Sequence, residues 1–157
     1  MPPAPAAVDP ALHRRLGVDL FNRVWALLEL DDPPPEQVDE LVHAAHASAY
    51  HWRQIGAPEN FARSEWQCSR VYAVLGRPEP ALHHARRCLE LCEQHGIGDW
   101  DLGFAYEALA RAHALAGDGA ETRRRLAQAA EQAGRVAEAD DREHLLAELA
   151  TITLPSD

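Results

Sequence analysis

Long apolar runs are missing from this sequence of 157 residues. A membrane-spanning helix needs about 20 consecutive apolar residues, and no stretch of the chain approaches that length. The start, Met1-Pro2-Pro3-Ala4-Pro5, also lacks the basic and apolar segments of a secretory signal. We therefore expect a soluble, cytoplasmic protein that does not enter a membrane.

Cysteine is scarce, and familiar catalytic motifs are missing. Cys68, Cys88 and Cys92 are an odd number of thiols in a chain without an export signal, which argues for reduced cysteines and against a disulfide framework. The sequence has no phosphate-cradling glycine loop, no serine elbow and no repeated Cys-x-x-Cys. A non-enzymatic protein is therefore favoured over an enzyme.

Positive charge is in deficit, because 25 Asp and Glu outnumber 15 Lys and Arg and leave a net charge of −10. Such a protein repels phosphate backbones and anionic lipid headgroups. We therefore expect neither nucleic acid nor a membrane as a partner. The hydrophobic content of 46% is that of a globular protein with a core.

Helical periodicity is what the chain has in quantity. After a proline-rich lead over residues 1–9, expected to be disordered, apolar residues recur at three- and four-residue steps through a single domain, residues 10–154. Asp99 is the expected N-cap of the fifth helix, and Glu143 and Glu148 suit a solvent-facing last helix. The predicted helices span residues 10–31, 36–56, 61–76, 79–96, 99–117, 120–134 and 141–151.

Glycines mark the predicted helix ends at a regular spacing. Gly56, Gly76, Gly96 and Gly117 follow one another at intervals of 20 or 21 residues, so one helix and one turn form the unit. Two units give a repeat of about 40 residues, which is typical of stacked helical hairpins. We predict an all-α, right-handed stack of three antiparallel hairpins plus a C-terminal capping helix. Small residues are expected at the helix crossings, at Ala45, Ala81, Ala85, Ala110 and Ala129.

The hairpins around Gly76 and Gly117 resemble the tetratricopeptide repeat, in which Gly or Gly-Asp separates two helices with small residues at their tightest crossings. The resemblance covers residues 59–134 and extends to residues 10–56 by analogy. The proline that commonly closes a unit is missing, and the repeat is about six residues longer than usual. Small or aromatic sites of the repeat fall on Ser69, Ala81, Ala85, Cys88, Ala110, Thr122, Leu126 and Ala129.

The resemblance implies a binding or scaffold module with a concave groove lined by the first helix of each pair. Arg70 and Arg111 occupy equivalent places in it, and two guanidinium groups beside the Trp66 ring suit a carboxylate or phosphate. The groove is therefore predicted to bind a protein or peptide, or a small anionic ligand. In the alternative, both arginines pair with neighbouring acids such as Glu65, Asp101 or Glu107. The implied groove residues are Arg63, Trp66, Arg70, Phe104, Glu107 and Arg111.

A second hypothesis is a small metal-binding protein or metalloenzyme. His84, Cys88 and Cys92 stand four residues apart and share one stripe of a helix, with Cys68 on the preceding helix. One imidazole and three thiolates are ligands that zinc or copper accepts. The alternative is that the cysteines are small core residues, since free cysteine is commonly buried.

A second metal set lies on the second predicted helix. His43 and His46 are three residues apart, a spacing that metal sites on helices use, and Glu65 from another helix would complete the set. The packed side of that helix is expected at Leu41, Ala45 and Ser48. In the alternative, His43 is an ordinary solvated histidine on the opposite side.

Phe21 and Trp25 are large apolar residues near one end of the predicted array. Such side chains are unfavourable in water as a contiguous patch. A homodimer would cover them, and so would the core of their own chain. The sequence leaves both alternatives open.

Overall fold

The computed structural model describes residues 1–4 and 6–156, and all regular elements in this part of the chain are α-helices. The predicted all-α class is therefore confirmed, and the predicted helix bounds differ from the observed ones by only a few residues. None of the helices described is long and apolar enough to cross a membrane. The helices are α1 (Pro10–Leu28), α2 (Pro35–Ile55), α3 (Pro58–Val74), α4 (Pro78–His95), α5 (Asp99–Leu115), α6 (Gly119–Ala133) and α7 (Ala139–Ala150).

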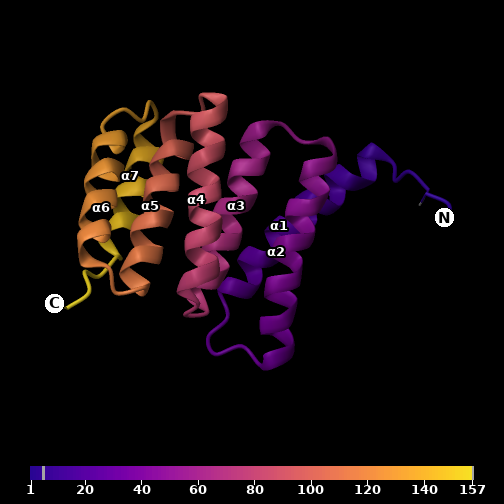
Figure 1. The fold of residues 1–157 in the computed structure, drawn as a ribbon, viewed down its shortest axis with the longest axis horizontal. Helices are drawn as coiled ribbons and strands as arrows, with labels where there is room; N and C mark the ends of the chain where they lie inside the picture. The colour runs from indigo at the N-terminus through magenta and orange to yellow at the C-terminus, as the bar shows by residue number, and fades with distance from the viewer. Residues whose placement is uncertain (5, 157) are drawn as a thin grey trace.

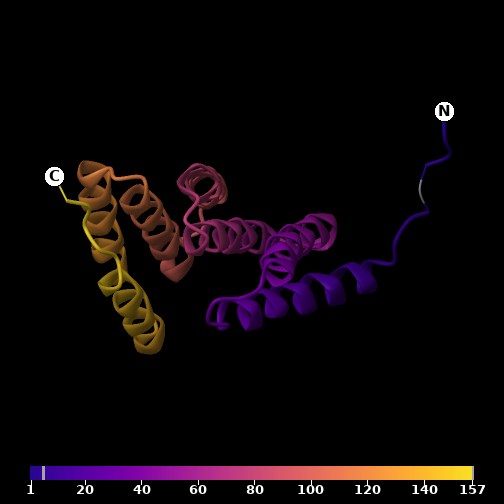
Figure 2. The ribbon, with the colours of Figure 1, turned by 90° about the horizontal axis from the view of Figure 1, so that it is seen from below.

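Neighbouring helices pack against one another in chain order along an elongated array (Figure 1). The most extensive contacts are those of α1 with α2, α3 with α4 and α5 with α6. Contacts of α2 with α3, of α4 with α5 and of α3 with α5 join these pairs, and α7 packs on α5 and α6 at the end. Figure 2 shows α1 and α7 on the same side of the array, with α3 and α5 between them. This arrangement of helices determines where the candidate site lies.

Proline starts four of the helices. Pro10, Pro35, Pro58 and Pro78 stand at the first helical position, where the missing N–H would have had no partner within the helix. Asp9 caps α1, because its side chain accepts a hydrogen bond of 2.9 Å from the backbone N–H two residues later. The described residues before Asp9 have no regular structure and are exposed.

The regularly spaced glycines end helices for two different physical reasons. Gly76, Gly96 and Gly117 have φ values of 71°, 63° and 81°, in the left-handed region that favours glycine. Gly56 has an ordinary φ of −82°, but a Cβ there would lie 2.7 Å from the carbonyl oxygen of Trp52. The spacing therefore marks the helix ends correctly, although only three of the four glycines are left-handed.

Asp99 does not cap α5 as expected. Gly98 is the N-cap, and Asp99 is the first helical residue, with a φ of 49°. Its carboxylate accepts a hydrogen bond of 3.0 Å from the backbone N–H of Ala137, and its carbonyl accepts one of 3.0 Å from the Gln132 side chain. Asp99 therefore ties the start of α5 to α6 and to the connection between α6 and α7.

Small side chains occupy the helix crossings. The Ser69 hydroxyl, itself buried, donates a hydrogen bond of 2.9 Å to the carbonyl of Ala81 and so links α3 to α4. All three cysteines are free and buried in the core, as the core interpretation of the thiols expected. The five alanines predicted at crossings are 2% exposed or less: Ala45, Ala81, Ala85, Ala110 and Ala129.

Candidate functional site

A cavity of about 310 Å³ opens between α1, α3, α5 and α7. Its size falls in the range of roughly 300–1,000 Å³ that is usual for ligand pockets. We call it the aromatic pocket, because five tryptophan and phenylalanine rings line it: Phe21, Trp25, Trp66, Trp100 and Phe104. The other lining residues are Ala62, Arg63, Cys88, Asp101, Asp141 and His144.

The rings of the aromatic pocket contact one another across three helices. The Trp66 ring lies 5.5 Å from Trp25, at an interplanar angle of 37°, and 5.6 Å from Phe104, at 80°. Trp100 meets Phe104 edge to face at 6.3 Å, and Phe21 meets Trp25 at 6.1 Å. Such tilted and edge-to-face pairs are favourable arrangements of aromatic quadrupoles. Three of the four tryptophans in the chain are thus held in one pocket.

Arg63 forms one polar edge of the aromatic pocket. Its Nε and Nη2 atoms each donate a hydrogen bond of 2.9 Å to the Asp101 carboxylate, and this bidentate pair raises the pKa of Arg63. The guanidinium carbon also lies 4.5 Å from the ring centroid of Trp100. The pocket therefore already holds one cation over the face of one of its tryptophans.

A buried carboxylate connects the pocket to a second group of charges. Glu107 is 1% exposed and accepts a hydrogen bond of 3.3 Å from the Trp66 indole N–H. Arg111 Nε donates to Glu107 at 2.7 Å, and Arg70 Nη1 does so at 3.4 Å. A carboxylate this deep requires such partners, because burial of an unpaired charge is very costly.

Arg70 and Arg111, expected to hold an anion, both pair with acidic residues. Arg70 Nη2 lies 2.7 Å from the Glu148 carboxylate, and Arg111 Nη2 donates to the Glu148 carbonyl at 3.1 Å. Glu148 was expected to face solvent, and this is corrected: it ties α7 to α3 and α5. Both arginines also line a more open hollow of about 360 Å³ beside Thr151. Their charges are balanced by Glu107, as in the alternative stated from the sequence, and by Glu148, which that alternative did not name.

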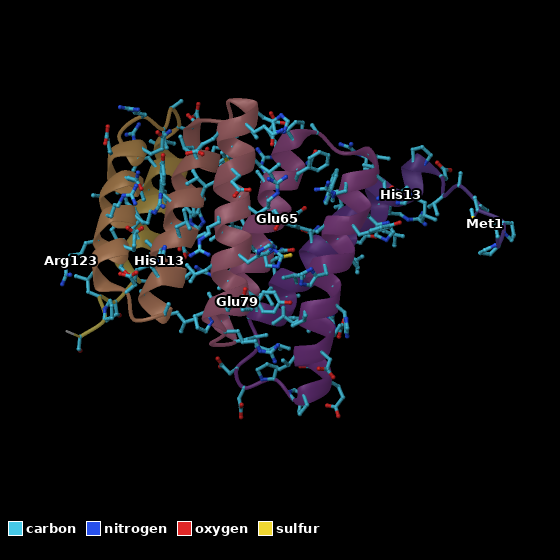
Figure 3. All side chains as sticks on the ribbon, viewed as in Figure 1. Met1, His13, Glu65, Glu79, His113 and Arg123 are labelled. Carbon is cyan, nitrogen blue, oxygen red and sulfur yellow. The ribbon has the colours of Figure 1, made fainter. Side chains whose placement is uncertain are left out.

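The fold brings two residues of each predicted metal set together in one cluster on α2, α3 and α4. Cys68 Sγ lies 4.0 Å from His46 Nδ1, and His84 Nδ1 lies 2.6 Å from a Glu65 oxygen. The rings of His46 and His84 are 5.3 Å apart. Tyr72 joins them, since its hydroxyl lies 2.8 Å from His46 Nε2 and its ring stacks on His84. Glu65 is near the middle of the array, where α3 and α4 run side by side (Figure 3).

The other predicted ligands lie outside this cluster. His43 is exposed, Cys88 lines the aromatic pocket, and the hydrogen bond with Cys92 together with burial raises the pKa of Cys88. Burial also raises the pKa of Cys68 to about 12, which disfavours the thiolate that metals bind. Within residues 1–4 and 6–156, no group of three or more His, Cys, Asp or Glu is arranged to hold a metal ion.

Several residues of the aromatic pocket were not anticipated from the sequence. Of the six predicted groove residues, Arg63, Trp66 and Phe104 line the pocket. Arg70, Glu107 and Arg111 form the adjacent charged network instead. Phe21, Trp25, Trp100, Asp141 and His144 were not predicted as groove residues. The available signal was the four-residue spacing of Phe21 with Trp25 and of Trp100 with Phe104, which puts each pair on one helix face.

No family model, curated protein or solved structure matches this chain. A functional conclusion therefore depends on the geometry and chemistry of the site itself.

Proposed function

We propose that this chain is a non-enzymatic binding or scaffold module that presents the aromatic pocket to a peptide. The observation that carries the proposal is the cavity of about 310 Å³ lined by three tryptophans and two phenylalanines. Apolar surface of this kind is unfavourable in water and favourable against an apolar group of a ligand. Buried aromatic anchors at the centre of an interface commonly supply most of its binding free energy.

The proposal includes a tetratricopeptide-like architecture, a right-handed stack of the hairpins α1–α2, α3–α4 and α5–α6 capped by α7. It is supported by the left-handed glycines in the α3–α4 and α5–α6 turns and by the buried alanines at the crossings. In such stacks the first helix of each pair lines the concave side. The first helices α1, α3 and α5 supply all five tryptophan and phenylalanine rings of the pocket.

A peptide is favoured over a small anionic ligand. Arg70 and Arg111 would have to leave Glu107 or Glu148 before they could bind an anion with full charge. Glu107 would then remain buried with fewer partners, at considerable cost. The aromatic pocket, in contrast, needs no ion pair to be broken before an apolar group enters.

Selection of peptides from a displayed random library on the immobilised protein tests this proposal. A selected peptide is then synthesised, and its affinity is measured by calorimetry. We expect Trp25→Ala to weaken binding by roughly tenfold or more, as for a hot-spot tryptophan. The control is Tyr50→Ala, which removes a 61% exposed aromatic residue outside the pocket. Equal effects of the two substitutions would place the binding site elsewhere.

The alternative function is a zinc or copper protein, or a metalloenzyme, using the cluster of His46, Glu65, Cys68, Tyr72 and His84. The two contacts that favour it are those of His46 with Cys68 and of His84 with Glu65. A tetrahedral zinc ion needs its ligand atoms gathered within about 2.0–2.3 Å of one point. These side chains would have to rearrange to reach that geometry, so we rank this function second.

We further propose that the protein acts in the cytoplasm, where its three buried thiols stay reduced. A homodimer is the competing way to occupy the aromatic pocket, since a second copy could cover Phe21 and Trp25. Light scattering of the purified protein at several concentrations separates the two cases. A monomer with a free pocket is the expected result.

A further inference from the structure

The walls of the aromatic pocket suit a cation as well as an apolar group. The faces of tryptophan and phenylalanine rings carry negative potential, and tryptophan attracts cations most strongly. Trp25, Trp66 and Trp100 line the cavity together with Phe104. The edge-to-face contacts of Trp66 and Trp100 with Phe104, both at 80°, leave the ring planes crossed and not stacked flat on one another.

Arg63 shows how this pocket accommodates a guanidinium group. Its guanidinium carbon stands 4.5 Å from the Trp100 centroid while its nitrogen atoms bind the Asp101 carboxylate at 2.9 Å. One tryptophan ring and one carboxylate thus bind one guanidinium group. The lining of the pocket contains a second carboxylate, that of Asp141, and further tryptophan rings.

Asp141 lies in the first turn of α7 and is partly exposed at the pocket. Among the described residues, none of the ion pairs includes the Asp141 carboxylate, and its neighbour Arg142 donates a hydrogen bond to the carbonyl of Val136. Arg63 and Asp101 line the pocket and neutralise each other, so the carboxylate of Asp141 leaves the Asp and Arg side chains of the lining with a net negative charge. His144 is the other titratable group lining the pocket beside them, apart from the buried thiol of Cys88.

We propose that the group which enters the aromatic pocket is the side chain of an arginine in the bound peptide, stacked on tryptophan and paired with Asp141. The proposal rests on the proposed function of the same pocket and specifies the chemistry of its ligand. Arginine fits better than lysine, because its planar guanidinium both stacks on rings and binds a carboxylate bidentately. The net charge of −10 adds a long-range attraction for a basic peptide.

The test compares blocked amino acids of matched shape and different charge by tryptophan fluorescence and calorimetry. N-acetyl-arginine amide is the cationic probe, and N-acetyl-citrulline amide is its neutral isostere. N-acetyl-lysine amide carries the same charge without the planar group, so it tests whether planarity matters. N-acetyl-glutamate amide is the anionic probe, and N-acetyl-tryptophan amide is the purely apolar one. We expect arginine to bind roughly 5- to 30-fold more tightly than citrulline, from one cation–π contact and one ion pair.

Two substitutions assign the preference to residues. Asp141→Asn should reduce arginine binding by roughly threefold or more and leave citrulline unchanged, because only the charged probe loses an ion pair. Trp25→Leu, which keeps an apolar wall without the ring, should also shrink the ratio of arginine to citrulline affinity. Asp140→Asn is the matched control, since this neighbour is exposed and does not line the pocket. Circular dichroism checks that each variant is folded.

Each alternative outcome has a definite meaning. Equal affinities for arginine and citrulline, or tighter binding of glutamate, would overturn the arginine proposal. Binding of the tryptophan probe alone would also overturn it, while the proposed peptide-binding pocket would stand. If none of the probes binds, the arginine proposal fails, and the library selection described above decides separately whether the pocket binds peptides.

Discussion

The indole N–H of Trp66 donates a hydrogen bond of 3.3 Å to the carboxylate of Glu107, which is 1% exposed. This contact joins the aromatic pocket to the charged network of Arg70, Arg111 and Glu148. The network in turn holds α7, which supplies Asp141 to the pocket. Binding surface and fold stability are therefore linked through one buried carboxylate.

Replacement of Glu107 by leucine should destabilise the protein. The substitution leaves Arg70 and Arg111 with only Glu148 as an acidic partner, and we expect a loss of about 2–4 kcal/mol, discounted because both arginines are 20% exposed. Urea unfolding followed by circular dichroism measures it. Glu90→Leu is the control, since its pair with Arg87 is exposed and should contribute roughly 1 kcal/mol or less. Equal unfolding midpoints for the two variants would contradict the assigned role of Glu107.

Overpacking at Ala85 tests the small-residue crossings. Ala85 is 0% exposed on α4, so Ala85→Phe should cost about 1–3 kcal/mol. Thermal unfolding measures the loss. Ala127→Phe on the exposed face of α6 is the matched control and should leave the melting temperature nearly unchanged. An unchanged melting temperature for Ala85→Phe would count against the predicted helix crossings.

Acidification should weaken the fold through His46. His46 keeps an exposed side, but loss of water from the part of its ring beside Tyr72 and Cys68, and then the charge of His84, lowers its pKa, so the folded state prefers the neutral ring. The unfolded chain therefore binds more protons, and stability present above about pH 6.5 is lost as the pH falls through the lower folded pKa. Urea titrations at neutral and mildly acidic pH should show this loss. It should be smaller in His46→Gln, and an identical pH dependence in that variant would refute the assignment.

Native mass spectrometry of the untagged protein distinguishes the proposed peptide-binding function from the metal-binding alternative. We expect the mass of the protein without stoichiometric zinc or copper, because its candidate ligand atoms are not gathered around one point. A metal adduct lost in both His46→Ala and Cys68→Ala would reverse the ranking in favour of the metal-binding alternative. Loss on Cys88→Ala alone would instead point to the stripe of His84, Cys88 and Cys92.

Local signals predicted the helix ends well. A glycine acts within one turn of the chain, so Gly76 and Gly117 could be interpreted from the sequence alone. The start of α3 at Pro58 comes three residues before the predicted start at residue 61. The Asp99 cap was wrong: Asp99 is the first helical residue, and its two carboxylate oxygens accept hydrogen bonds from the backbone N–H groups of Trp100 and Ala137. No local pattern reports the long-range contact with Ala137. The tetratricopeptide-like handedness and repeat stay predictions.

The candidate site was predicted only in part, because it depends on contacts between distant helices. The tetratricopeptide resemblance placed Trp66 and Phe104 on the first helices of their pairs, and both line the aromatic pocket. Trp25 and Asp141 come from α1 and α7, at the two ends of the array, and they line one cavity because these two helices lie on the same side of the array. For the same reason, neither predicted metal set paired His46 with His84, which are adjacent in space.

The indole N–H resonances of the four tryptophans provide the most direct test of the binding pocket. A two-dimensional ¹⁵N NMR spectrum is recorded while a library-selected peptide is added, with assignments from single Trp→Phe variants. Binding in the aromatic pocket predicts shifts for Trp25, Trp66 and Trp100, which line it, and none for Trp52, which does not. Shifts confined to Trp52, or peptide binding that leaves all four signals in place, would contradict the account.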